Sequence, residues 1–123
     1  MPVQADQVTS KNVYETSAAS DGYRVLATRY WPRGVSKTAV DEYVIDLAPS
    51  RTLLHQYRDG QLTWDRFTNQ YLREMRSETA RRELHRLAKL SRSGTITVMC
   101  VCKDEARCHR SLLRRLIVEH DEG

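Results

Sequence analysis

Apolar runs of strand length occur at several places in the chain. Residues 95–102 are apolar at almost every position, which is typical of a strand buried on both faces of a parallel sheet. Residues 23–29 have an apolar centre and are rich in strand-forming residues, which also predicts a strand. Residues 43–47 are a candidate for a second buried strand, and residues 12–14 for a short one.

The segments between these runs follow a helical period. From Trp64 to Met75 the apolar side chains recur at spacings that place them on one face of a helix. Ser50, Thr63 and Ser77 each precede such a segment, where a hydroxyl group accepts a hydrogen bond from the first helical turn. We therefore expect helices at residues 50–57, 63–75, 77–93 and 109–119.

Strands that alternate with helices indicate an α/β fold. We expect one small domain of three layers, with helices on the faces of a mostly parallel central sheet of about three to five strands. The length of 123 residues fits a single domain. Residues 1–11 are expected to form a flexible N-terminal segment, residues 12–120 the domain, and residues 121–123 a tail.

Charge changes this picture mainly through its distribution. The formal net charge of +4 permits an anionic partner without requiring one. The segment from Arg24 to Lys37, however, contains Arg29 and Arg33 and has no acidic residue. No apolar run approaches the length of about 18–20 residues that a membrane span needs. The N-terminus also lacks the features of a secretory signal, so we expect a cytoplasmic location without membrane contact.

The loops at residues 29–34 and 102–110 follow two of the expected strands. Ligands of a parallel sheet bind beyond the carboxyl ends of its strands, so these loops are the candidate site. Their basic residues are Arg29, Arg33, Lys103, Arg107 and Arg110. With the free N–H groups at the start of the last helix, these side chains could hold an oxyanion. They would share one pocket if the two strands are neighbours; the alternative is that they are surface residues, some paired with Asp104 or Glu105.

Three cysteines, Cys100, Cys102 and Cys108, lie within nine positions. This odd, crowded set is not a disulfide framework, and in a reducing cytosol such residues are thiols, metal ligands or core residues. Cys108 precedes the last helix, next to His109 and Arg110, and this setting favours a thiolate nucleophile. His109 is the candidate base, although adjacent residues at a helix start rarely face each other. Equally, Cys108 could cap or pack the helix, and Cys100 fits the core.

A metal site is a further alternative, because Cys102, Cys108 and His109 include ligands suited to zinc or iron. The chain has no paired Cys-x2-Cys sequence, so a fourth ligand would come from a distant part of the chain. Candidates for it are His55, His85 and His120. Each of these histidines is more typical of a helix surface, which makes the metal site the weaker alternative.

Four segments carry a resemblance to a known family. They are Trp-Pro-Arg-Gly within residues 23–34, Asp-Leu-Ala-Pro-Ser at 46–50, the aromatic helix from Trp64, and Cys-His-Arg within 102–110. Through them the chain resembles the prokaryotic family catalogued as domain of unknown function 488, over about residues 12–120. The resemblance implies a small α/β domain with no agreed activity. The positions that match the family are Arg29, Pro32, Arg33, Cys108, His109 and Arg110.

Two positions depart from the family pattern. Thr28 stands where members often carry an aspartate, and Cys102 stands where many carry an acidic or small residue. The resemblance therefore implies neither an acidic role at Thr28 nor a catalytic role for Cys102.

The leading functional hypothesis is a pocket for an anionic, phosphate-bearing small molecule or nucleic acid. Tyr30 and Trp31 could stack on a base, whereas the simpler expectation is that Trp31 packs against the core beside Pro32. A cysteine-dependent enzyme that uses Cys108 and His109 is the second hypothesis, and a metal-binding domain is the third. The sequence leaves open whether the protein is an enzyme and names no cofactor.

Overall fold

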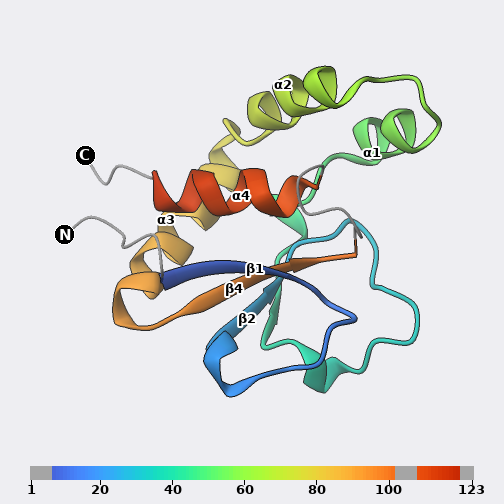
Figure 1. The fold of residues 1–123 in the computed structure, drawn as a ribbon. Helices are drawn as coiled ribbons and strands as arrows, with labels where there is room; N and C mark the ends of the chain where they lie inside the picture. The colour runs from blue at the N-terminus through green and yellow to red at the C-terminus, as the bar shows by residue number, and fades with distance from the viewer. Residues whose placement is uncertain (1–6, 102–107, 120–123) are drawn as a thin grey trace.

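Four parallel strands form the centre of the structure, a computed structural model that describes residues 7–101 and 108–119 (Figure 1). Strand β4 (Ile96–Cys100) lies between β1 (Val8–Asn12) and β2 (Tyr23–Leu26), and β2 also pairs with the edge strand β3 (Glu42–Tyr43). All five residues of β4 are buried, as expected of a central strand in a parallel sheet. The predicted α/β class, with one small domain around a parallel sheet, is confirmed.

Four α-helices occur where the sequence places them. They are α1 (Arg51–Arg58), α2 (Trp64–Glu74), α3 (Glu78–Ser93) and α4 (His109–Val118). The hydroxyl groups of Ser50, Thr63 and Ser77 each accept a hydrogen bond from the backbone N–H three residues later, which confirms the predicted N-caps. Within the described residues, every helix is too short or too polar to span a bilayer.

The two faces of the sheet are covered differently. Val25 and Val98 point to the face on which α3 and α4 pack, and they belong to the main hydrophobic core. Helices α1 and α2 lie on the same side of the sheet (Figure 1). The neighbouring strand residues Leu26 and Met99 point to the opposite face, because side chains alternate along a strand. There they contact residues of the strand connections, which contain only the short 3-10 helices η2 (Ala19–Asp21) and η3 (Lys37–Ala39).

Both edges of the sheet differ from the expected pattern. Residues 8–11, expected in a flexible segment, form most of β1, paired with β4 from Val8 to Asn12. Only Val8 of β1 is fully buried, so this strand has no apolar alternation that a sequence pattern could detect. At the other edge, β3 has two residues, and residues 45–47 form the 3-10 helix η4 (Ile45–Leu47) instead of a strand. The Leu47 carbonyl accepts a hydrogen bond of 2.8 Å from the buried Tyr71 hydroxyl.

Asp21 lies at the other face of the sheet, where its polar groups are all engaged. Its carboxylate accepts hydrogen bonds from the Ala18 N–H at 2.9 Å and the Lys11 ammonium at 3.1 Å. Its backbone carbonyl accepts one from the Thr97 hydroxyl of β4 at 2.6 Å. The Ala18 N–H, followed by Lys11, holds the pKa of the Asp21 carboxyl below its usual range, against the opposing effect of burial.

Gly22 connects η2 to β2 at a point where no side chain fits. Its φ of 63° lies in the region that favours glycine. A Cβ atom at this position would overlap the carbonyl oxygen of Thr95, which accepts a 2.9 Å hydrogen bond from the Tyr23 N–H where β2 begins.

Replacing Gly22 by alanine is therefore expected to lower the free energy of unfolding by about 3 kcal/mol or more, since backbone strain and a steric clash add together. Gly60→Ala is the matched control, because Gly60 also has a positive φ, of 78°, but has no atom within 4 Å of an added Cβ. We expect Gly60→Ala to cost about 1 kcal/mol in urea denaturation. Equal losses in the two variants would contradict the close approach of Gly22 to Thr95.

The Asp21 contacts predict a specific loss of stability in acid. Since the pKa of Asp21 in the folded chain lies below its unfolded value of 3.8, its contribution is complete above that pH and disappears as the pH falls through the folded pKa. Asp21→Asn should therefore destabilise the protein at pH 7, by about 1–3 kcal/mol, and progressively less below pH 4. Chemical denaturation at several pH values, with the exposed Asp59→Asn as control, measures this. A destabilisation that does not change with pH would contradict the assignment.

Candidate functional site

The carboxyl ends of β2 and β4 lie side by side, because these strands are neighbours in the sheet. The chain that follows β2 therefore passes the start of α4. The two loops could share one pocket only if their strands were neighbours, and the structure meets this condition. A hydrogen bond of 2.5 Å between His109 Nε2, on the first residue of α4, and the Ala27 carbonyl oxygen, just after β2, connects the two. The structure thus brings the segment that begins at Arg29 next to the Cys-His-Arg segment.

His109 is a buried, neutral imidazole in this arrangement. Burial lowers its pKa to about 4, the hydrogen bond to the Ala27 carbonyl acts in the opposite direction, and the charge of Arg110 lowers the pKa further. Because a carbonyl oxygen only accepts hydrogen bonds, Nε2 carries the proton and Nδ1 keeps its lone pair. The imidazole also lies against the ring of Tyr71, with centroids 5.7 Å apart.

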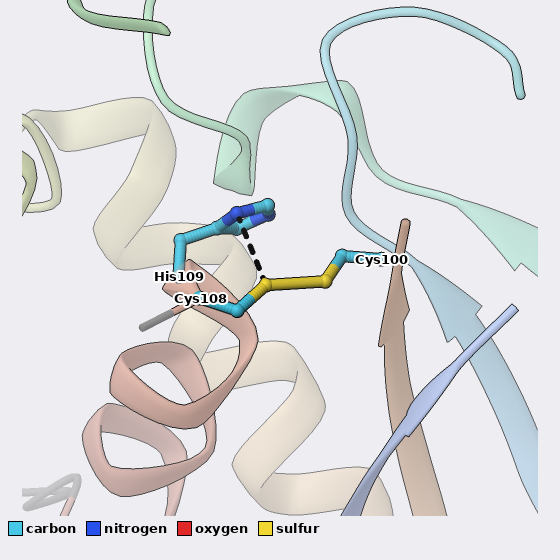
Figure 2. Close-up of side chains that lie close together, drawn as sticks. All are labelled: Cys100, Cys108 and His109. Atoms are coloured by element: carbon cyan, nitrogen blue, oxygen red, sulfur yellow. Dashed lines mark hydrogen bonds between the residues drawn. A yellow bond between two sulfur atoms is a disulfide. The ribbon is translucent and has the colours of Figure 1, made fainter. Parts of the chain in front are cut away.

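Cys108 and His109 face each other, which corrects the expectation for adjacent residues at a helix start. Figure 2 shows the Cys108 sulfur directed toward the imidazole, with 3.9 Å between Sγ and Nδ1. The reason is that Cys108 is the N-cap of α4 and has an extended backbone, with φ −133° and ψ 142°, so the helical spacing rule does not apply to it.

Cys100 and Cys108 are joined as a disulfide, which connects the end of β4 to the start of α4 (Figure 2). The prediction that the crowded cysteines form no disulfide is wrong: the two residues are eight positions apart, but strand and helix bring their side chains together. The expectation that Cys100 belongs to the core is confirmed, since it is fully buried. Cys102, the other cysteine, lies outside the described residues.

Arg110 points toward the sulfur atoms. Its Nη1 donates a hydrogen bond of 3.2 Å to Cys100 Sγ, and the residue is only 3% exposed. The structure therefore does not place Arg110 in one pocket with Arg29 and Arg33, which the sequence analysis expected. Its position one residue into a helix that packs on β4 turns the side chain into the protein.

A cavity of about 420 Å³ lies at the carboxyl ends of β2 and β4. Arg29 and Arg33 line it together with His109, so part of the predicted set does converge there. Arg58, at the end of α1, also lines it, and the sequence analysis missed this residue because only the packing of α1 brings it near. The aromatic residues in the lining are Tyr14, Tyr30, Trp31 and Tyr57. Among the described residues that line the cavity, none is acidic.

Two side chains of the lining, Arg29 and Trp31, are held in place by hydrogen bonds to the backbone. Arg29 Nε donates to the Pro49 carbonyl at 3.0 Å, which anchors this side chain across the loop. The Trp31 indole N–H donates to the Val35 carbonyl at 2.9 Å, and its ring packs edge-on against Tyr43. Trp31 is 38% exposed and lies at the cavity, which corrects the expectation that it packs against the core.

Lys103 and Arg107, with Asp104 and Glu105, lie outside the described residues, as does His120. Of the other two histidines considered as distant metal ligands, His85 is exposed on α3. His55 is exposed on α1, where its Nε2 lies 3.1 Å from the Tyr30 hydroxyl oxygen. Neither belongs to the group of His109 and the two cysteines, which is the potential metal-ligand cluster found among the described residues.

The family of the chain follows from comparison with known proteins. Residues 8–121 match the model of a family described as the active DUF488-N3 subclade. The chain belongs to the DUF488 family. The chain is 32% identical to the uncharacterized protein YeaO of Escherichia coli strain K12 over 108 residues. This aligned region covers 86% of the chain and 92% of YeaO. The uncharacterized protein Rv3073c of Mycobacterium tuberculosis strain H37Rv is 32% identical over 117 residues, 94% of this chain and 97% of that protein. No solved structure matches significantly.

The disulfide predicts how many thiols this DUF488 chain exposes when it is denatured. Of its three cysteines, Cys100 and Cys108 are joined. Non-reducing denaturation should therefore release one thiol that reacts with a chromogenic disulfide reagent, and prior reduction should release all three. Cys102→Ser is the control, because it should remove the signal from the unreduced protein. Three reactive thiols without reduction would contradict the bond.

Proposed function

We propose that the protein binds a small phosphate-bearing molecule with a flat ring, such as a nucleotide, in the cavity at the carboxyl ends of β2 and β4. The observation that carries this proposal is the composition of the lining. Three arginines and four aromatic residues surround one cavity, and no acidic residue of the described chain lines it.

The arginines supply the charge for an anion. Arg33 and Arg58 are exposed, and their planar guanidinium groups can hold phosphate oxygens in a bidentate manner. Arg29 adds positive charge while its Nε donates to the Pro49 carbonyl. The first residue of α4, His109, also lines the cavity, so the positive end of that helix dipole lies beside it.

The aromatic residues supply a surface for a flat ring. Tyr30 and Trp31 follow β2, whereas Tyr57 is on α1, so rings from two elements border the same space. Stacking of a nucleobase on an aromatic side chain contributes about 1–3 kcal/mol. The volume of about 420 Å³ lies within the range of pockets for small molecules, which favours a mononucleotide-sized ligand over an extended nucleic acid.

The geometry supports a cysteine-dependent enzyme less well. Cys108 is 1% exposed and its sulfur is bonded to Cys100. His109, the candidate base, would have to hold a proton in a buried site where the pKa is about 4, so at neutral pH it is a poor acceptor for the thiol proton.

Isothermal titration with AMP, adenosine and inorganic phosphate tests the proposal, because it separates the ring from the anion. AMP is expected to bind more tightly than either of its parts. Arg33→Gln and Arg58→Gln should each weaken AMP binding about tenfold, since each removes a charge-assisted hydrogen bond. Arg81→Gln, on the exposed surface of α3 and away from the cavity lining, is the matched control.

Affinity for AMP should also fall as salt concentration rises in the wild type, and less so in the double variant of Arg33 and Arg58. If AMP does not bind, or binds equally well to the wild type and the double variant, the cavity is not the site of a phosphate-bearing ligand.

A further inference from the structure

Three potential metal ligands meet between the end of β4 and the start of α4. The sulfur atoms of Cys100 and Cys108 and one ring nitrogen of His109 all lie within 4.8 Å of one another, and the three residues are buried (Figure 2). Two thiolates and an imidazole form a ligand set that suits zinc and similar ions. In the structure the two sulfurs are bonded to each other, so the set is available to a metal only when the disulfide is reduced.

His109 has the orientation of a metal ligand. Its Nε2–H donates to the Ala27 carbonyl oxygen, so the lone pair of Nδ1 is on the side of the ring that faces Cys108 Sγ. Histidines that bind metals almost always donate their other ring N–H to a carbonyl or carboxylate group, which fixes the tautomer and directs the ring. The Ala27 carbonyl fills this supporting position, and its hydrogen bond to Nε2 does not involve the sulfur atoms.

Positive charge lies beside both sulfurs. Arg110 Nη1 lies 3.2 Å from Cys100 Sγ, where it donates a hydrogen bond and places a positive charge beside the sulfur. Cys108 is the N-cap residue of the ten-residue helix α4, whose dipole stabilises negative charge at this end.

The backbone spacing of the pair also fits a shared ion. The Cα atoms of Cys100 and Cys108 are 7.9 Å apart. Two thiolates at about 2.3 Å from a tetrahedral zinc ion are about 3.8 Å apart, so they need a wider separation than a direct bond does.

We propose that the reduced protein binds one divalent zinc-type ion through Cys100 Sγ, Cys108 Sγ and His109 Nδ1. A dithiol reductant transfers two electrons and two protons to the disulfide and becomes a disulfide itself. The metal ion then displaces the two thiol protons. When a disulfide oxidant takes two electrons from the two thiolates and is itself reduced to thiolates, the Cys100–Cys108 bond forms again, both sulfur ligands are lost and the ion is released. Metal binding therefore depends on the redox state of this pair.

The described residues supply three ligands and leave a fourth coordination position. Within the described residues the cluster has three members, whereas zinc prefers four ligands, and sites with three protein ligands bind water or a small ligand in the fourth position. His109 also lines the cavity, so the ion would lie beside the pocket. The metal proposal shares His109 with the cavity lining but uses no cavity arginine, tyrosine or tryptophan, so the two proposals can be tested separately.

The test is a titration of the chain with Co²⁺ after reduction by a phosphine and removal of metal by a chelator. Two thiolate ligands predict a charge-transfer band in the near ultraviolet that saturates at one Co²⁺ per chain and disappears when Zn²⁺ is added. Protein with its disulfide intact is the control and should show no such band. Absence of the band from the reduced wild type would overturn the proposal without reference to any variant.

Variants then identify the ligands. Cys108→Ser and His109→Ala should each raise the Kd for Zn²⁺ at least about tenfold in competition with a chromophoric chelator. Cys102→Ser and the exposed His85→Ala are the matched controls and should bind as the wild type does, with circular dichroism used to verify that every variant is folded. Wild-type affinity in a folded Cys108→Ser or His109→Ala variant would overturn the assigned ligand set.

Discussion

The hydrogen bond between His109 and the Ala27 carbonyl fixes the relation between the last helix and the sheet. It joins the first residue of α4 to the chain just beyond β2, at 2.5 Å and inside the protein. A buried carbonyl without a partner costs about 1–3 kcal/mol, so the helix start is held where the imidazole can reach this oxygen. The same bond decides which nitrogen of the ring carries the proton.

Two different surroundings result on either side of this imidazole. On one side the chain after β2 and the end of α1 form a cavity in which the charged lining residues that the structure describes, Arg29, Arg33 and Arg58, are all basic. On the other side Nδ1 faces the sulfur of Cys108, which is bonded to Cys100 at the end of β4. One buried histidine thus lies between the proposed nucleotide site and the proposed metal site, and the two proposals can be tested separately.

The parts of the fold that rest on local chemistry could be predicted from the sequence. Ser50, Thr63 and Ser77 identify three helix starts because an N-cap hydroxyl acts on its own first turn. The central strand β4 is evident because burial on both faces requires a continuous apolar run. The edge strands could not be predicted in this way. Strand β1 is only partly buried and β3 has two residues, so their pairing depends on the neighbouring strand.

The candidate site was located by its position at the carboxyl ends of the strands, but its membership depends on packing. Arg58 enters the cavity because α1 folds back over the loop, and no local signal marks it. Arg110, which was expected to line the pocket with Arg29 and Arg33, does not line the cavity, because its side chain turns toward Cys100. The pairing of Cys108 with Cys100 likewise depends on how α4 approaches β4, which the eight-residue separation does not reveal.

The account depends most on the cavity being a site for a phosphate-bearing ligand. A crystal structure of the protein grown in the presence of AMP tests this most directly. Phosphate oxygens are expected within hydrogen-bonding distance of Arg33 and Arg58, and the base is expected against one of the aromatic residues of the lining. AMP bound at another surface, with the cavity empty and both arginines turned to solvent, would contradict it.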